Sequence, residues 1–291
     1  MRLAVKVTAL FVFLLSAGTA LAQLRTPLCR HGKGQLETEF LDFKIRIEGL
    51  RPEDAHDVDD PEGSCKAQVT SAKGAKVFEA EDVMMDLVVF TDDLNGDQKH
   101  DVAFEGFSGG AHCCFTLWVV SLADPPGLIQ KIENNTDFSF ARGKGGRVEI
   151  QTGDGSFDNF DSLSHADSPF PSVHIRLEGT KLIDAGPEHW ADYEAWIAEV
   201  RKELSADQVT RFRSLKNMDD VAGHDLWSTE SMVLEIALSY LYGGRQADAE
   251  RILDEMWPVF DRERIWKLIL KTRSEGILKD AVKHRGSRPP L

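Results

Sequence analysis

Residues 86–107 read Asp-Leu-Val-Val-Phe-Thr-Asp-Asp-Leu-Asn-Gly-Asp-Gln-Lys-His-Asp-Val-Ala-Phe-Glu-Gly-Phe, an acidic turn between two apolar runs. Short apolar runs that are bounded by turn residues predict β-strands, here over residues 86–90 and 102–107. Because a strand rather than a helix follows Asp101, the pattern disfavours the helix–loop–helix of an EF-hand. The stretch therefore predicts two strands joined by an acidic loop.

The acidic loop carries side-chain oxygens at spacings that suit a metal ion. The four residues are Asp93, Asn95, Asp97 and Asp101. Several oxygen ligands around one point favour a hard cation, and at this spacing we expect calcium, with the backbone carbonyl of Lys99 as a fifth ligand. Glycine usually makes the tight turn of such a loop, and holding Gln98 there costs about 1 kcal/mol. The alternative is an acidic turn that binds nothing tightly.

Outward from this loop, the chain shows strand periodicity first and helical periodicity later. Polar and apolar residues alternate over residues 41–48, and further strands are expected at 115–122, 148–151 and, as a hairpin, 173–177 with 181–183. From about residue 187 the apolar spacing is helical, with a break expected at Gly276. We therefore predict an α+β protein with an N-terminal antiparallel β region, propeller-like or sandwich-like, followed by a C-terminal helical region. The expected divisions are a signal peptide (1–22), a β domain with the calcium-type loop (23–186), a helical domain (187–284) and a disordered tail (285–291).

The N-terminus predicts export. Arg2 and Lys6 precede an apolar run at residues 7–15, and Ala20-Leu21-Ala22 is a small-x-small cleavage signal. This pattern predicts a cleaved signal peptide and a periplasmic or secreted protein without membrane insertion. The 291 residues carry a net charge of −14, which disfavours nucleic acid as a partner. An unknown protein or cell-envelope partner is expected instead.

The chain has four cysteines, Cys29, Cys65, Cys113 and Cys114. An even number in an exported protein predicts two disulfides, and three pairings are open. Because neighbouring residues on a strand face opposite sides, we expect Cys29 and Cys65 each to bond one member of the adjacent pair. A bridge between Cys113 and Cys114 is the strained alternative.

The central part of the chain resembles a known kind of calcium loop. Asp93-Leu94-Asn95-Gly96-Asp97, then Asp101-Val102-Ala103, is similar to the FG-GAP/VCBS loop of β-propeller repeats. The Ser-Gly-Gly-Ala-His-Cys-Cys segment at 108–114 extends the likeness to a group of exported bacterial proteins of unassigned role. The resemblance implies calcium bound by the five residues named above. Gln98 departs from the usual glycine, and one repeat does not close a propeller.

Two other stretches can be interpreted either as ordinary structure or as functional motifs. Residues 154–161 are acidic but wrongly spaced, so we expect a plain surface loop rather than a degenerate second calcium loop. In the helical region, small and large residues match one tetratricopeptide-like hairpin, although ordinary helix packing requires the same pattern. The hairpin residues are Ala237, Tyr240, Gly244, Ala249, Leu253 and Met256.

The function expected from these features is that of an exported, calcium-stabilised binding or scaffold protein without catalytic activity. The alternative is an extracytoplasmic hydrolase with an acidic cleft between the β and α parts. Ser108 lies near His112, but no Gly-x-Ser-x-Gly motif is present. A compact pocket that joins His112 or His165 to two carboxylates would favour the hydrolase.

Overall fold

A computed structural model of the chain describes residues 27–56, 60–110, 114–223 and 226–283. The predicted signal peptide (1–22) and the predicted disordered tail (285–291) lie outside these residues. None of the helices in the described part of the chain has the length and apolar character that a membrane span requires.

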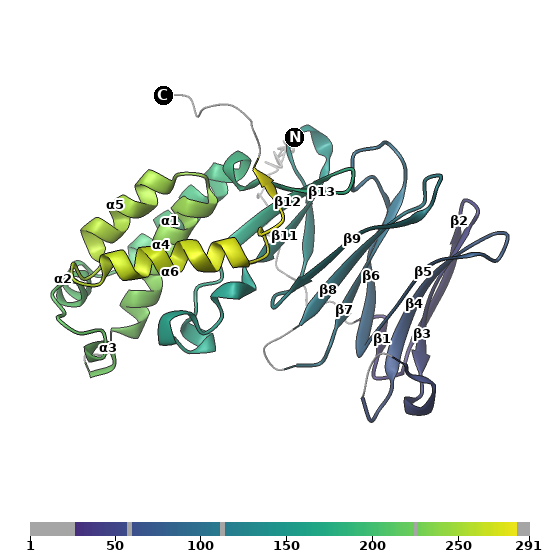
Figure 1. The fold of residues 1–291 in the computed structure, drawn as a ribbon, viewed down its shortest axis with the longest axis horizontal. Helices are drawn as coiled ribbons and strands as arrows, with labels where there is room; N and C mark the ends of the chain where they lie inside the picture. The colour runs from purple at the N-terminus through teal and green to yellow at the C-terminus, as the bar shows by residue number, and fades with distance from the viewer. Residues whose placement is uncertain (1–26, 57–59, 111–113, 224–225, 284–291) are drawn as a thin grey trace, which may run out of the picture.

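The described strands form three sheets. Figure 1 shows them as successive layers: the sheet of β10–β14 lies beside the helices, and the sheet of β2–β5 lies furthest from them. The first sheet has the order β2-β3-β4-β5, the middle sheet β1-β6-β7-β8-β9 and the third sheet β10-β11-β12-β13-β14. All pairs are antiparallel except β13 with β14, and none of the three sheets closes into a barrel. The strands are β1 (Cys29–Arg30), β2 (Gln35–Phe40), β3 (Phe43–Leu50), β4 (Ser64–Ser71), β5 (Lys76–Asp82), β6 (Met84–Asp92), β7 (Asp101–Phe107), β8 (Phe115–Ser121), β9 (Gly127–Asn134), β10 (Ser139–Arg142), β11 (Val148–Gly153), β12 (Ser172–Glu178), β13 (Lys181–Asp184) and β14 (Val282–Lys283).

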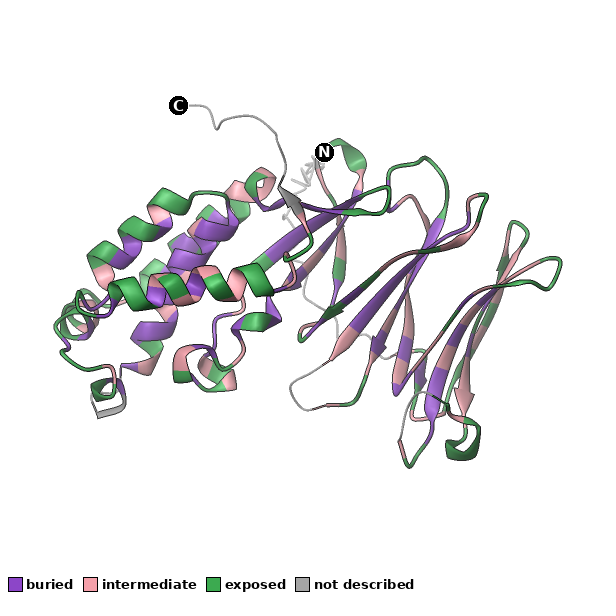
Figure 2. Ribbon diagram, viewed as in Figure 1, coloured by how far each residue is buried: buried purple, intermediate pink, exposed green. Residues whose placement is uncertain are grey.

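The middle sheet is buried on both faces. Successive side chains of each strand point to opposite sides, so they enter two different hydrophobic clusters. Phe104 and Trp118 pack toward the first sheet, in a cluster with Ile45 and Val69. Ala103 and its neighbours on the other face join the larger cluster, which includes the third sheet and the helices. Burial is accordingly nearly continuous along β8, as Figure 2 shows. The loop that joins β6 to β7 thus begins and ends in a fully covered sheet.

The predicted α+β class and the antiparallel β region are confirmed. The hairpin expected near residue 180 is β12–β13, which turns at Gly179 and Thr180. The single strand expected over 41–48 is wrong at its start, because β2 and β3 are separate strands that turn at Leu41, where φ is 52° and the side chain is 66% exposed. Alternation alone cannot distinguish a strand from a strand that begins at a tight turn.

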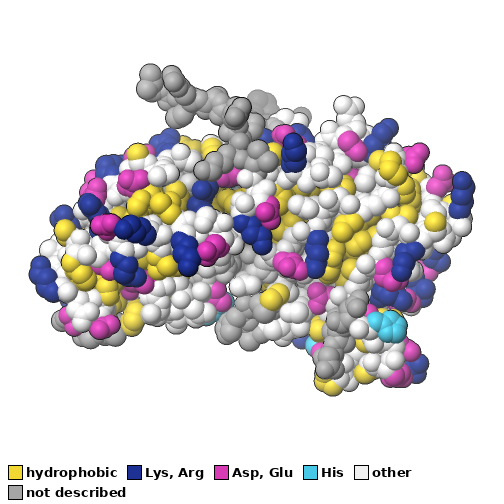
Figure 3. All heavy atoms as spheres, viewed as in Figure 1, with side chains coloured by type: hydrophobic (Ala, Val, Ile, Leu, Met, Phe, Trp, Pro, Cys, Tyr) yellow, Lys and Arg dark blue, Asp and Glu magenta, His cyan; other side chains and the backbone are white. Residues whose placement is uncertain are grey.

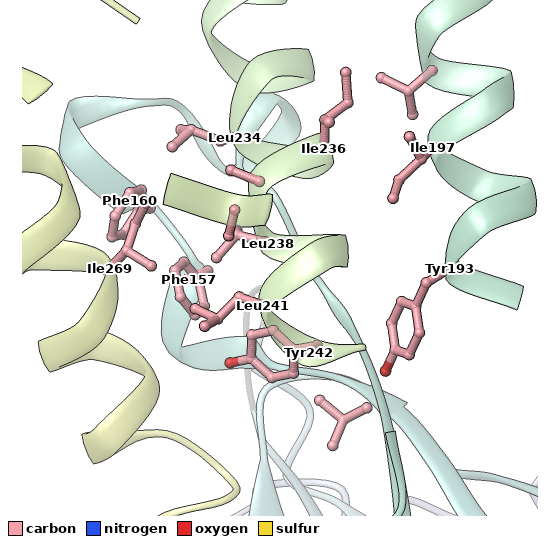
Figure 4. Packing of buried hydrophobic residues seen from close by; sticks show 14 of the residues in the cluster. Phe157, Phe160, Tyr193, Ile197, Leu234, Ile236, Leu238, Leu241, Tyr242 and Ile269 are labelled. Atoms are coloured by element: carbon pink, nitrogen blue, oxygen red, sulfur yellow. The ribbon is translucent and has the colours of Figure 1, made fainter. Parts of the chain in front are cut away.

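The helices are α1 (Trp190–Glu203), α2 (Ala206–Arg213), α3 (Asp220–Gly223), α4 (Trp227–Tyr242), α5 (Gln246–Met256) and α6 (Arg262–Glu275). Helix α4 is buried around most of its circumference and lies at the centre of the group. Figure 4 shows Phe157 and Ile269 on one side of α4, and Tyr193 and Ile197 of α1 on the other. A helix that is apolar all round must be covered on every side, which explains its central place.

The chain returns to the third sheet at its C-terminal end. The break expected at Gly276 is confirmed, because α6 ends at Glu275. The helical continuation expected to His284 is wrong, because Val282–Lys283 forms β14 beside β13. One hydrophobic cluster contains residues from both sides of the boundary predicted near 186, so sheet and helices share a core. The division into two domains remains a prediction.

The disulfide pairing expected from the sequence is wrong. Cys29 in β1 and Cys65 in β4 are bonded to each other, with Cα atoms 5.8 Å apart. Strand β1 pairs with β6 at the edge of the middle sheet and also contacts β4, so the two cysteines face one another between the layers. Cys113 lies outside the described residues.

The stretch 154–161 is not the surface loop that we expected. Asp154 is fully buried, and the hydroxyl of Tyr242 donates a hydrogen bond to its Oδ2 at 2.5 Å. Phe157 is also fully buried and packs with Phe160 against the helices. The prediction of a surface loop overlooked Phe157 and Phe160, the two phenylalanines that place this segment in the core.

Candidate functional site

The loop predicted to hold calcium connects the end of β6 with the start of β7. Its backbone makes the tight turn that the pattern requires: φ is 63° at Gln98 and 79° at Gly96. Positive φ is strained for glutamine, and this is the conformation in which glycine usually stands. The expected turn is therefore present, with the expected departure from glycine.

Side-chain oxygens of the loop fold back onto its own amides. Asp93 accepts hydrogen bonds from the amides of Gly96, at 2.6 Å, and Gln98, at 2.9 Å. Asn95 Oδ1 accepts from the amide of Asp97 at 3.0 Å, and Asp97 Oδ1 accepts from the amide of Lys99 at 2.8 Å. Asparagine and aspartate favour such turns because their side chains reach the amide two residues ahead. These bonds hold the loop in a defined shape.

Asp101 lies beneath the loop and is fully buried. Its Oδ2 accepts hydrogen bonds from the amides of Leu94, at 2.8 Å, and Asn95, at 3.3 Å. Its Oδ1 is the one buried carboxylate oxygen in the described part of the chain that has no hydrogen-bond partner. Burial, reinforced by the charges of Asp97 and Asp93, raises the pKa of Asp101 to about 6. An unpartnered buried carboxylate is costly, and a bound cation would supply the missing partner.

The three carboxylates of the loop are not drawn together as tightly as a bound ion requires. Among the described residues, only Glu149, His174 and His189 bring three acidic or histidine ligand atoms within 4.8 Å of one another. At least one pair among Asp93, Asp97 and Asp101 therefore stands further apart than that limit allows. Ion binding would have to draw the loop inward, which costs conformational entropy and lowers the affinity.

The loop also touches the third sheet. The amide of Gly179, in the β12–β13 turn, donates a hydrogen bond to the carbonyl of Asn95 at 2.9 Å. The guanidinium of Arg147 lies against Gly96, where any side chain would collide with it, and it donates to the carbonyl of Leu177 at 3.0 Å. The loop that connects two strands of the middle sheet is thus a contact between the middle and third sheets.

A second group of functional side chains lies where the third sheet meets α1. Glu149 comes from β11, His174 from β12, and His189 ends the short helix η6 (Gly186–His189). His189 Nε2 lies 2.6 Å from Glu149 Oε2, and the two imidazoles are stacked with centroids 4.0 Å apart and planes at 6°. Burial, followed by the neighbouring His189, lowers the pKa of His174 to about 4. We call these three residues the histidine cluster.

Each member of the histidine cluster has a further polar partner. Glu149 Oε1 lies 3.3 Å from the guanidinium of Arg176, which also reaches Glu178 and Glu188. His189 Nδ1 lies 3.2 Å from Asp192 Oδ2, and His174 Nδ1 lies 3.4 Å from Gln151 Nε2. The sequence did not indicate this cluster, because its members are far apart in the chain. The pairing of β11 with β12, in which Gln151 lies opposite His174, brings Glu149 and His174 close together.

A cavity of about 460 Å³ adjoins the histidine cluster, between β12 and the helices α1 and α4. His174 and Asp192 line it, together with the aromatic rings of Tyr193 and Trp196. Glu235 of α4 lines it as well, and burial raises the pKa of this carboxyl. The cavity therefore joins one imidazole to two carboxylates at the junction of the sheets and helices.

Neither of the two histidines named for the hydrolase alternative, His112 and His165, is found in this cavity among the described residues. His112 lies outside the described residues, as does Cys113. His165 does not line the 460 Å³ cavity; its Nδ1 lies 2.8 Å from Asp158 Oδ1, and its ring contacts Phe170. The histidine that lines this cavity is a different one, His174.

Comparison with protein-family models, with curated protein sequences and with solved structures finds no match for this chain.

Proposed function

We propose that the chain is an exported binding or scaffold protein in which loop 93–101 holds one calcium ion. The observation that carries this proposal is Oδ1 of Asp101, a fully buried carboxylate oxygen without a partner among the described residues. It lies under a loop whose backbone already has the positive φ that the pattern requires at Gln98. A cation coordinated there would remove the cost of burying an unpaired charge.

The chemistry of the donors favours calcium over other ions. The side chains of Asp93, Asn95, Asp97 and Asp101 offer only oxygen, and so does the carbonyl of Lys99. Calcium accepts six to eight oxygens at about 2.3–2.6 Å in flexible geometry, whereas magnesium demands a near-ideal octahedron. A loop that must move inward to close on its ion suits the more tolerant cation.

The ion would strengthen the junction between two sheets. The amide of Gly179, in the β12–β13 turn, and the guanidinium of Arg147, just before β11, contact the loop at Asn95 and Gly96. A closed loop presents these contacts in one geometry, so calcium would stabilise the third sheet and the helices that pack on it. On the face shown in Figure 3, acidic and basic side chains are interspersed, so this face has no single charged patch that would mark a partner site.

Export is part of the proposal. The sequence of the first 22 residues predicts a signal peptide, and the Cys29–Cys65 disulfide suits an oxidising compartment. Calcium outside the cell is abundant enough for a loop with an affinity of about 10⁻⁴–10⁻³ M, the range of extracellular modules. The loop's strained Gln98 and separated carboxylates fit such modest affinity.

Thermal unfolding of the mature chain in calcium and in chelator tests the proposal. A ligand that binds only the folded state at about 100 times its Kd adds about 2.7 kcal/mol to the free energy of unfolding. We expect the wild type and the control Asp42→Asn, which changes an exposed aspartate in the β2–β3 turn, to gain stability with calcium. Asp97→Asn should gain much less. Equal behaviour of Asp97→Asn and wild type, or no calcium effect on either, would sink the proposal.

A second candidate function, an exported hydrolase, is favoured by the 460 Å³ cavity. It places His174 near Asp192 and the half-buried Glu235, between the sheets and the helices. An imidazole and carboxylates in one cavity are groups that general acid–base catalysis uses. Chromogenic ester, phosphate and glycoside substrates test this candidate, with His174→Ala compared with His165→Ala. Turnover that survives His174→Ala unchanged, or no turnover by the wild type, would argue against it.

A further inference from the structure

The histidine cluster has the composition of a transition-metal site. Two imidazoles and one carboxylate are ligands that zinc and related divalent ions favour, and the calcium loop has no nitrogen ligand among its expected donors. All three ligand atoms lie within 4.8 Å of one another. We propose that Glu149, His174 and His189 bind one divalent transition-metal ion of the zinc class, independently of the calcium loop.

The partners of the three residues are those that orient metal ligands. A metal-binding histidine usually donates its second ring N–H to a carboxylate, a carbonyl or a water, which fixes the ring and its tautomer. His189 Nδ1 lies 3.2 Å from Asp192, and His174 Nδ1 lies 3.4 Å from the side-chain amide of Gln151. Nε2 of His189 is then available to the ion once the proton shared with Glu149 leaves. The amide nitrogen of Gln151 can only donate, so His174 Nδ1 accepts here and Nε2 carries the proton. His174 would bind the ion through Nε2 after the Gln151 amide turns its oxygen toward Nδ1. Glu149 and His189 are therefore already oriented by their partners, and His174 needs this one rotation.

Local charge also favours a cation. Among the described residues, Arg176 is the one guanidinium paired with this cluster, and it is shared by Glu149, Glu178 and Glu188. It lies 3.3 Å from Oε1 of Glu149 and so leaves Oε2 toward His189. Asp192 adds a fourth carboxylate, beside His189. Of the four, only Glu149 is fully buried. A divalent ion would be attracted by the negative charge that one guanidinium leaves unbalanced.

Small movements would convert the present arrangement into a coordination site. The 2.6 Å separation of His189 Nε2 and Glu149 Oε2 now spans a hydrogen bond. Ligand atoms about 2.0–2.2 Å from a tetrahedral ion stand somewhat further apart, so the pair must open slightly as the shared proton leaves. The stacked rings, with planes at 6°, must also turn relative to one another. Rotation about the terminal torsion of histidine has a broad range, so this adjustment is small.

An ion at the cluster would be accessible from the 460 Å³ cavity, because His174 borders both. Zinc with three protein ligands keeps a fourth position for water or a ligand. The cavity's aromatic rings and carboxylates would then surround whatever occupies that position. The proposed site is therefore of the open kind rather than the closed structural kind.

Cobalt(II) titration of the mature protein, followed by visible absorption, tests the site, with zinc competition as the second readout. We expect one cobalt ion per chain with the absorption of a four-coordinate site, displaced by zinc. His189→Ala should abolish the band. Asp192→Asn, which alters an exposed carboxylate and leaves the three ligands intact, should lower the affinity by about 10-fold or more.

His165→Ala is the matched control, because His165 is another histidine whose Nδ1 contacts a carboxylate, Asp158 at 2.8 Å. It should bind cobalt as the wild type does. No cobalt band in the wild type, or equal affinity of wild type, His189→Ala and Asp192→Asn, would overturn the proposal. Asp97→Asn should leave cobalt binding unchanged, so failure of the calcium loop and failure of this site are distinguishable.

Discussion

Asparagine at position 101 should change the stability of the protein in opposite directions with and without calcium. In chelator, the wild type buries a carboxylate whose Oδ1 has no partner among the described residues. Leaving a buried polar group unsatisfied costs about 1–3 kcal/mol. Asparagine keeps an oxygen that can accept the hydrogen bonds from the amides of Leu94 and Asn95, and it removes the negative charge. We therefore expect Asp101→Asn to raise the free energy of unfolding in chelator by about 1–2 kcal/mol, since its amide group is itself only partly satisfied.

Calcium should reverse this order. At a concentration about 100 times the Kd, the ion adds about 2.7 kcal/mol to the wild type. Asp101→Asn lacks the buried negative ligand and should gain little. Urea unfolding at pH 7.5, followed by tryptophan fluorescence in chelator and in excess calcium, measures both differences. If Asp101→Asn is the less stable protein in chelator as well, the buried oxygen is not costly and the reasoning fails.

The pH dependence provides an internal check on this reasoning. Burial raises the pKa of Asp101 from 3.8 to about 6 in the folded protein. The folded state therefore holds its proton more tightly than the unfolded state, so calcium-free stability falls as pH rises through this interval. The advantage of Asp101→Asn in chelator should shrink below pH 6 and be largest above it. A constant difference from pH 4 to 8 would contradict the assigned cause.

Three further predictions rest on other residues. Gln98→Gly should relieve the positive φ of 63°, add about 1 kcal/mol to the free energy of unfolding, and tighten calcium binding in titration calorimetry. Burial raises the pKa of Glu230 to about 8, so the folded state holds the proton more tightly than the unfolded state and stability falls as pH rises from 4.5 to 8. Glu230→Gln should accordingly add about 3 kcal/mol at pH 7 and flatten the stability profile between those pH values, which urea unfolding at several pH values measures. Removing the Cys29–Cys65 bridge, whose partners are 36 residues apart, with serine at both positions should lower the urea midpoint, at a cost of about 4 kcal/mol; an unchanged midpoint would show that the link does not restrict the unfolded chain.

Local pattern predicted those features that depend on local geometry. The alternation of the strands, the β12–β13 turn at Gly179 and the positive φ at Gln98 all follow from neighbouring residues. The order of strands then helices was also readable, because periods of 2 and 3.6 differ over a few turns. Alternation failed at Leu41, where a tight turn interrupts it, and the strands β4, β5, β9 and β10 were not predicted.

The features that sequence reasoning missed depend on how layers pack. The pairing of Cys29 with Cys65 requires β1 to lie on the edge of the middle sheet, opposite β4. The burial of Asp101 requires sheets on both faces of β7. His174 and His189 meet only because η6 turns back over β12 after the β13 strand. No local pattern encodes these contacts, since each joins segments that are distant in the chain.

Anomalous scattering from crystals of the mature protein grown with calcium tests the central claim most directly. The account predicts one calcium peak at about 2.3–2.6 Å from Oδ1 of Asp101, with Asp93, Asn95 and Asp97 turned toward it. Loop 93–101 without a peak at saturating calcium, and Oδ1 of Asp101 bonded instead to a protein donor, would contradict it.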